Sequence, residues 1–186
     1  MFLLSGFMLI FWVIFMIIMV LILVGSYLAS AIALYKMADN AGYKYPWIAW
    51  IPLFNDYLVY VLAKRKFDML GIFSTNNRGM IALIVLASAY MGAAINAVPV
   101  VGSVAYAVLF VAVRVCTWRK YYDLMHTYER DESISMLLSI LAVFIPVVGL
   151  IILIMNMNET PEYGYHGYYN EDTLAVDPLT ETVRKE

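Results

Sequence analysis

The chain has 186 residues, of which 63% are hydrophobic and 14% are charged, and its formal net charge is -2 at pH 7. Soluble domains average about 45–50% apolar and about 25% charged residues, so this composition excludes an ordinary water-soluble domain. Residues 1–35, 79–113 and 134–157 contain no charged side chain. A helix needs about 20 apolar residues to cross a bilayer. We therefore predict an all-α integral membrane protein with about four transmembrane helices and one re-entrant or interfacial segment.

The first predicted span covers about residues 5–34. A cleaved signal peptide has a basic start and an apolar core of about 7–15 residues, whereas this segment has no Lys or Arg and is longer. We expect an uncleaved span, and cleavage near the small residues at 30–33 is the alternative. Gly25 and Ala29 are four residues apart, a spacing that lets a second helix approach closely.

Residues 46–63 are interrupted by Pro52, Asn55 and Asp56. An ionised aspartate at the centre of a bilayer costs at least about 2.5 kcal/mol, and proline breaks a helix. This composition favours a re-entrant or interfacial segment. A complete crossing of the membrane is the alternative that its length allows.

Residues 79–98 and 100–118 are predicted to form two spans that fold back on each other at Pro99 and Gly102. Ser88 and Gly92 offer a small-residue face for this hairpin. One long kinked helix is the alternative.

Residues 134–157 are predicted to form the last span, with a bend at Pro146 and Gly149. The tail, 158–186, is acidic and rich in tyrosine, and it lacks hydrophobic periodicity. We predict an extended or disordered tail.

Basic residues are concentrated in the loops 36–78 and 119–132. Because Lys and Arg near membrane ends stay cytoplasmic, we predict that both loops are cytoplasmic and that both termini are extracytoplasmic. The expected location is the plasma membrane, with several crossings.

Few residues suggest chemistry. The candidate functional polar positions are Asn55, Asp56, Asn96 and Arg114. For Arg114, the structural alternative is a side chain that reaches the head groups, and for Asn55 and Asp56 it is a turn at the interface. Asp68, Asp123 and Glu129 are expected in solvated loops.

The chain contains no recognisable nucleophile, metal-binding or phosphate-binding motif. His126 and His166 are forty residues apart. We therefore expect no catalytic residue, metal, cofactor or nucleic-acid partner.

Residues Lys36–Asn55 read K-x-A-x3-G-x4-W-x-A-x-I-P-x2-N. This pattern resembles a family of uncharacterised small polytopic membrane proteins that are found mostly in Gram-positive bacteria. The resemblance implies a bacterial cell membrane and no assigned activity.

Two functions fit these features. The first is a non-catalytic membrane protein that acts by association, as an accessory or assembly subunit or an immunity-type protein. It would form a homo-oligomer or bind a membrane-protein partner within the lipid bilayer. The alternative is a small oligomeric channel or transporter that uses the proline-broken segment around Asn55 and Asp56.

Overall fold

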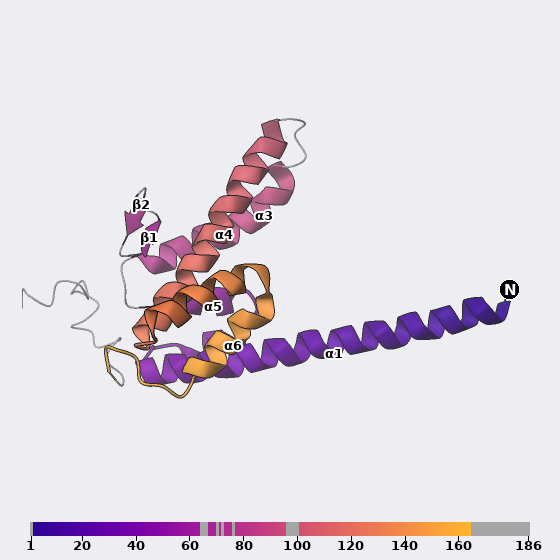
Figure 1. The fold of residues 1–186 in the computed structure, drawn as a ribbon, viewed down its shortest axis with the longest axis horizontal. Coiled ribbons are helices and arrows are strands. Elements are labelled where there is room, and N and C mark those ends of the chain that lie inside the picture. Colours follow the sequence, from indigo (N-terminus) through magenta and orange to yellow (C-terminus); the bar gives the residue numbers. More distant parts are fainter. Residues whose placement is uncertain are drawn as a thin grey trace, which may run out of the picture.

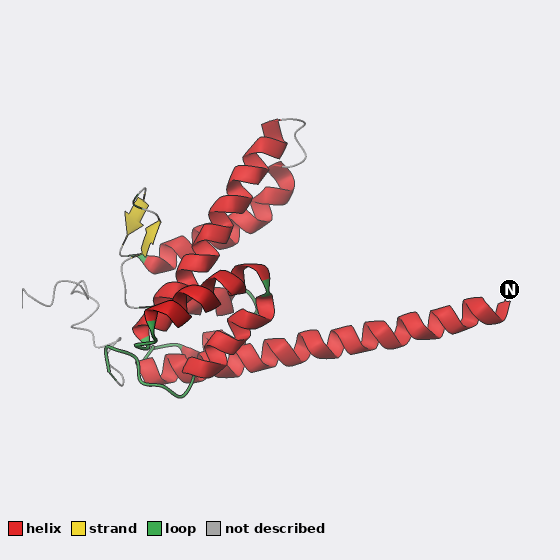
Figure 2. Cartoon of the chain, in the orientation of Figure 1, coloured by secondary structure: helices red, strands yellow, loops and turns green. Residues whose placement is uncertain are grey.

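The computed structural model describes residues 2–63, 67–69, 71, 73–75, 77–95 and 101–164, and it is dominated by helices (Figures 1 and 2). The predictions for Asn96, for Pro99 and for the tail beyond residue 164 lie outside the described residues. In chain order, the elements are α1 (Phe2–Ala41), the 3-10 helix η1 (Pro46–Trp50), α2 (Phe54–Leu62), β1 (Phe67–Met69), β2 (Phe73–Thr75), α3 (Arg78–Ile95), α4 (Val101–Thr127), α5 (Glu132–Phe144) and α6 (Pro146–Asn156).

Helix α1 has two parts with different surroundings. Residues 8–24 are all apolar, and each is between 43% and 69% exposed. Figure 1 shows this part projecting away from the other helices. The C-terminal part is buried at Leu34, Met37 and Ala38. A Cβ at Gly25 would meet no atom within 4 Å, so no neighbouring helix of the described chain approaches this predicted packing position.

The end of α1 is set by local chemistry. Gly42 adopts φ 76, the left-handed conformation that glycine tolerates after a helix end. The backbone N–H of Tyr43 then donates to the carbonyl of Ala38 at 2.8 Å. The chain turns here, and Pro46 starts η1.

Helices α3 and α4 lie side by side as a hairpin (Figure 1). A Cβ at Gly92 would lie 3.3 Å from Cε2 of Tyr106, so the missing side chain lets the two helices approach. The other predicted packing residue, Ser88, donates its hydroxyl to the carbonyl of Val85 in its own helix. Gly102 lies in the first turn of α4 and is buried.

Residues 134–157, predicted as one span with a bend at Pro146, form two short helices that meet at this proline. Helix α5 ends at Phe144 and α6 begins at Pro146, and the chain reverses between them. Arg130, before α5, donates to Oδ1 of Asn156 at 3.1 Å and to the carbonyl of Met155 at 2.9 Å, so the outer ends of the two helices meet.

The reversal has a local cause. Proline disfavours helical backbone at the residue before it, and Ile145 is extended, with φ -122 and ψ 98. The 13 residues of α5 and the 11 residues of α6 extend for about 20 Å and 17 Å, less than the hydrocarbon core of a bilayer. Gly149 was predicted as a bend, but it lies within α6, where its missing side chain makes room for the ring of Tyr121.

The main core forms where the C-terminal part of α1 meets η1, α2, α5, α6 and the C-terminal end of α4. Its buried members include Met37, Leu58, Leu62, Met125 and Ile152. A second, smaller cluster joins Tyr60 and Phe67 to α3 and α4. The packed part of the chain is thus at one end of α1 and α4.

Candidate functional site

A cavity with a volume of about 440 Å³ lies beside the first turn of α2. Four helices, α1, α2, α4 and α6, contribute to its walls. The lining residues are Ile22, Leu23, Ser26, Tyr27, Ser30, Leu34, Asn55, Asp56, Val59, Tyr121, Pro146, Val147, Leu150 and Leu153. Two predicted candidate residues, Asn55 and Asp56, are therefore neighbours at one site.

The turn before α2 positions these two side chains. Pro52 lies in this turn, and Leu53 adopts φ 79. A bulky residue with this φ is strained by about 1–3 kcal/mol, and the packing around it must compensate. Helix α2 starts at Phe54, which places Asn55 and Asp56 in its first turn, where the helix dipole favours a carboxylate.

The orientation of the Asn55 amide follows from its neighbour. The hydroxyl of Ser30 donates to the carbonyl of Tyr27 at 2.8 Å, so its oxygen is left to accept from Nδ2 of Asn55 at 3.3 Å. Oδ1 of Asn55 is then buried, and it has no hydrogen-bond partner among the described residues. An unpaired buried acceptor costs about 1–3 kcal/mol.

Asp56 forms an ion pair with Lys120 of α4. The distance from Nζ of Lys120 to Oδ1 of Asp56 is 2.6 Å. The side chain of Lys120 is 6% exposed, and that of Asp56 is 64% exposed. The buried ammonium lies 4.9 Å from the ring centre of Tyr121 and 5.7 Å from that of Tyr60. Burial raises the pKa of the Tyr60 phenol, so this ring stays neutral beside the cation. The carboxylate of Asp56 is thereby held by a group that is itself almost inaccessible.

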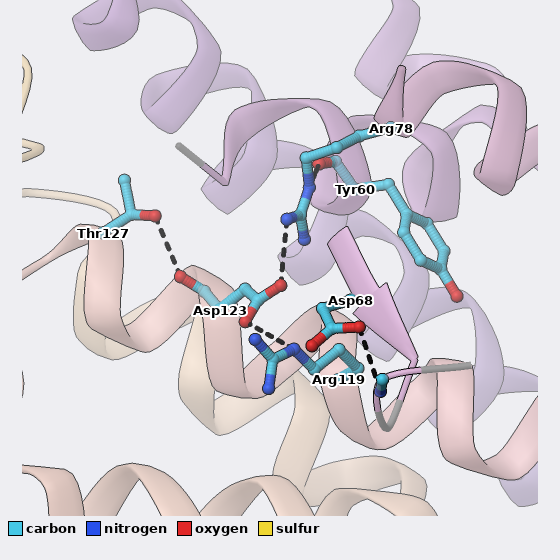
Figure 3. A network of polar contacts seen from close by, with 7 residues as sticks. Tyr60, Asp68, Arg78, Arg119, Asp123 and Thr127 are labelled. Carbon is cyan, nitrogen blue, oxygen red and sulfur yellow. Dashed lines mark hydrogen bonds and ion pairs between the residues drawn. The ribbon is translucent and has the colours of Figure 1, made fainter. Parts of the chain in front are cut away.

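A second polar cluster joins residues of α2, α3 and α4 (Figure 3). Asp123 is fully buried, 2.9 Å from Nη1 of Arg78 and 2.9 Å from Nε of Arg119. Arg78 also donates through Nε to the carbonyl of Tyr60 at 2.7 Å, and the hydroxyl of Thr127 donates to the carbonyl of Asp123. These contacts join the start of α3 to the C-terminal ends of α2 and α4.

The burial of Asp123 corrects the expectation of a solvated loop charge. Arg119 and Asp123 are four residues apart, the spacing of an ion pair on one helix face. This spacing was a signal in the sequence, but Arg78 is 45 residues away and could not be paired with Asp123 in that way. Asp68, by contrast, accepts from the backbone N–H of Gly71 in the exposed turn after β1.

Arg114, the remaining described candidate, does not line the cavity. Its Nη1 donates to the carbonyl of Val143 at 2.7 Å, and its guanidinium lies 4.8 Å from the ring centre of Phe110. The last carbonyls of a helix have no partner within the helix. Arg114 therefore caps the end of α5 at the tip of the α5–α6 hairpin.

Among the described residues, no group of three or more His, Cys, Asp or Glu side chains is placed to hold a metal ion. The helices and the cavity define a helical protein in which two helices, Met8–Ala41 and Gly102–Thr127, are long and apolar enough to cross a membrane. No family model, curated protein or solved structure matches this chain.

Proposed function

We propose that the chain is a non-catalytic integral membrane protein that acts by association, as an accessory or assembly subunit or an immunity-type protein. The observation that carries this proposal is the projecting part of α1. Its 17 apolar residues, 8–24, extend for about 25 Å, and each is at least 43% exposed. In water this surface would be costly, whereas lipid and a neighbouring apolar helix both cover it without loss.

The proposed membrane arrangement differs from the four spans expected from sequence. Helices α1, α3 and α4 cross the bilayer, η1 and α2 lie at its interface, and the α5–α6 hairpin enters and leaves on one side. The contact of Arg130 with Asn156 supports the hairpin, because it joins the outer ends of α5 and α6.

The sidedness follows from the basic residues. The C-terminal end of α1, the start of α3 and the C-terminal end of α4 carry the basic loops 36–78 and 119–132, which we place in the cytoplasm of a bacterial cell. The N-terminus is then extracytoplasmic. Residue 158 lies on the cytoplasmic side, in contrast to the expectation that both termini are outside.

Association through α1 predicts a repeated contact face. Single cysteines introduced along residues 9–23, in a Cys116→Ser background, are expected to crosslink in membranes at positions three to four residues apart. A cysteine at Val108, an exposed residue of α4, serves as the control. A second copy of the chain gives a crosslinked dimer, and another membrane protein gives a larger adduct. Absence of both at every position would overturn the proposal.

The second candidate is a small oligomeric channel or transporter. It is favoured by one observation, the cavity beside Asn55 and Asp56 at a proline-broken segment. Solute or ion flux in liposomes is expected to fall in Asp56→Asn. Equal flux through the variant and the original protein would remove Asp56 from any transport mechanism.

A further inference from the structure

The cavity opens toward the surface that we assign to lipid. Ile22 and Leu23 line it, yet they are 61% and 69% exposed and continue the apolar surface of residues 8–24. A molecule dissolved in the bilayer therefore reaches the cavity sideways, without passing through water. This inference rests on the proposed membrane embedding, but not on association between chains.

The polar end of the cavity offers hydrogen-bond acceptors. The hydroxyls of Ser26, Tyr27 and Ser30 already donate to the backbone carbonyls of Leu23, Trp50 and Tyr27, respectively. A ligand can therefore use only lone pairs of these oxygens, and Ser30 already accepts from Nδ2 of Asn55 with one of its own.

Two further acceptors stand beside these hydroxyls. Oδ1 of Asn55, a residue of the cavity wall, is buried without a partner among the described residues, and the side chain of Asp56 is 64% exposed although its Oδ1 pairs with Lys120. A ligand that fits this set must supply hydrogen-bond donors.

The other walls select for an amphiphile. Leu34, Val59, Leu150 and Leu153 present apolar surface, and a volume of about 440 Å³ is within the usual range of about 300–1,000 Å³ for small-molecule sites. Lys120 balances the charge of Asp56, so the site does not require a ligand with net positive charge. Because the polar atoms are acceptors, an anionic group is disfavoured at the inner end.

We propose that this cavity binds the polar end of a membrane lipid whose head group donates hydrogen bonds. An ammonium with N–H groups and a glycerol with free hydroxyls both meet this requirement. A trimethylammonium head group does not, because it carries no donor.

Native mass spectrometry of the full-length protein tests this assignment. The protein is delipidated and offered equal mixtures of phosphatidylcholine with either phosphatidylethanolamine or phosphatidylglycerol, all with the same acyl chains. Retention of either donor lipid about tenfold above phosphatidylcholine is expected. In a further series with mono- and dimethylated phosphatidylethanolamine, this preference should fall with each N–H group that is replaced by a methyl group. Preference for ethanolamine alone identifies an ammonium, and preference for glycerol alone identifies a hydroxyl. Equal retention of phosphatidylcholine would overturn the proposal.

A matched pair of variants locates the effect. Asn55→Leu removes the unpaired acceptor and is expected to abolish the preference, whereas Asn158→Leu changes an exposed asparagine outside the cavity and should retain it. Unchanged preference in Asn55→Leu would refute the site. If that variant does not fold, the series of methylated lipids on the original protein still tests whether the site requires hydrogen-bond donors.

Carbonate extraction of the membranes distinguishes a failure of the proposed lipid site from a failure of the proposed membrane embedding. Protein that resists extraction but shows no lipid preference contradicts only the cavity assignment. Protein that is extracted contradicts the membrane embedding itself.

Discussion

Asp123 lies 2.9 Å from Arg78, although the two residues are 45 positions apart, and neither side chain is more than 5% exposed. Arg78 begins α3 and Asp123 lies near the end of α4, so the ion pair joins the open ends of this hairpin (Figure 3). A buried ion pair adds little net stability by itself, but the loss of one partner leaves an uncompensated charge. The pair therefore specifies how the two helices meet.

Replacement of Asp123 by asparagine is expected to lower the free energy of unfolding by about 3–5 kcal/mol, because two arginines lose their counter-charge. Thermal unfolding in detergent, followed by size-exclusion chromatography, measures the change. Glu132→Gln, an exposed position, is the control. A loss below about 1 kcal/mol for Asp123→Asn would show that the cluster tolerates an unpaired charge.

The ion pair of Asp56 and Lys120 predicts unequal effects of its two partners. Asp56→Asn leaves a buried ammonium without its carboxylate and should cost about 1–3 kcal/mol. Lys120→Met leaves an aspartate that water hydrates, so its cost should stay within about 1 kcal/mol. Chemical unfolding of the two variants, measured side by side, tests the order. The reverse order would mean that Lys120 is not enclosed.

Gly149 is predicted to be intolerant of a methyl group. A Cβ there would overlap the hydroxyl of Tyr121, so Gly149→Ala should destabilise the protein by about 1–3 kcal/mol. Removal of that hydroxyl in the double variant Gly149→Ala, Tyr121→Phe should restore part of the loss.

The matched control is Gly25→Ala, because no atom lies within 4 Å of a Cβ there. In the interior of α1 this change should be neutral or stabilising by up to about 1 kcal/mol. Equal melting temperatures for the two alanine variants would contradict the close packing of Tyr121 on α6.

The α5–α6 hairpin predicts the accessibility of its two outer ends. Single cysteines at Ser133 and Asn158, in a Cys116→Ser background, should react with a membrane-impermeant maleimide from the same side of sealed vesicles. Labelling from opposite sides would restore the single span 134–157. A cysteine at Thr160, in the same segment as Asn158, should label with it and serves as the internal control.

Local patterns in the sequence were sufficient for several features. The charge-free runs predict helices, and the small residue Gly92 predicts close packing within the α3–α4 hairpin, where it meets Tyr106. Proline at position 146 predicts an interrupted helix, because it lacks the backbone donor and excludes helical backbone before it. The small hairpin of β1 and β2 lies within the loop 36–78, for which no strand was predicted.

The same patterns did not determine the direction of the chain after Pro146 or the role of Arg114. A proline at 146 allows both a kink and a complete reversal, and the contact of Arg130 with Asn156 distinguishes them. Arg114 was a candidate for function, but the carbonyl that it caps belongs to α5.

Asn55 and Asp56 stand out in the sequence because polar residues are rare in apolar segments, and their cost in lipid is a property of each residue alone. Their surroundings depend on residues far along the chain. Asp56 meets Lys120 across 64 positions, and Asn55 meets Ser30 across 25. The sequence by itself determined that this chain is helical and largely apolar, since periodicity and composition are local. Only the tertiary structure decided which charges are paired and which acceptor is left free, because those depend on distances between helices that no local pattern encodes.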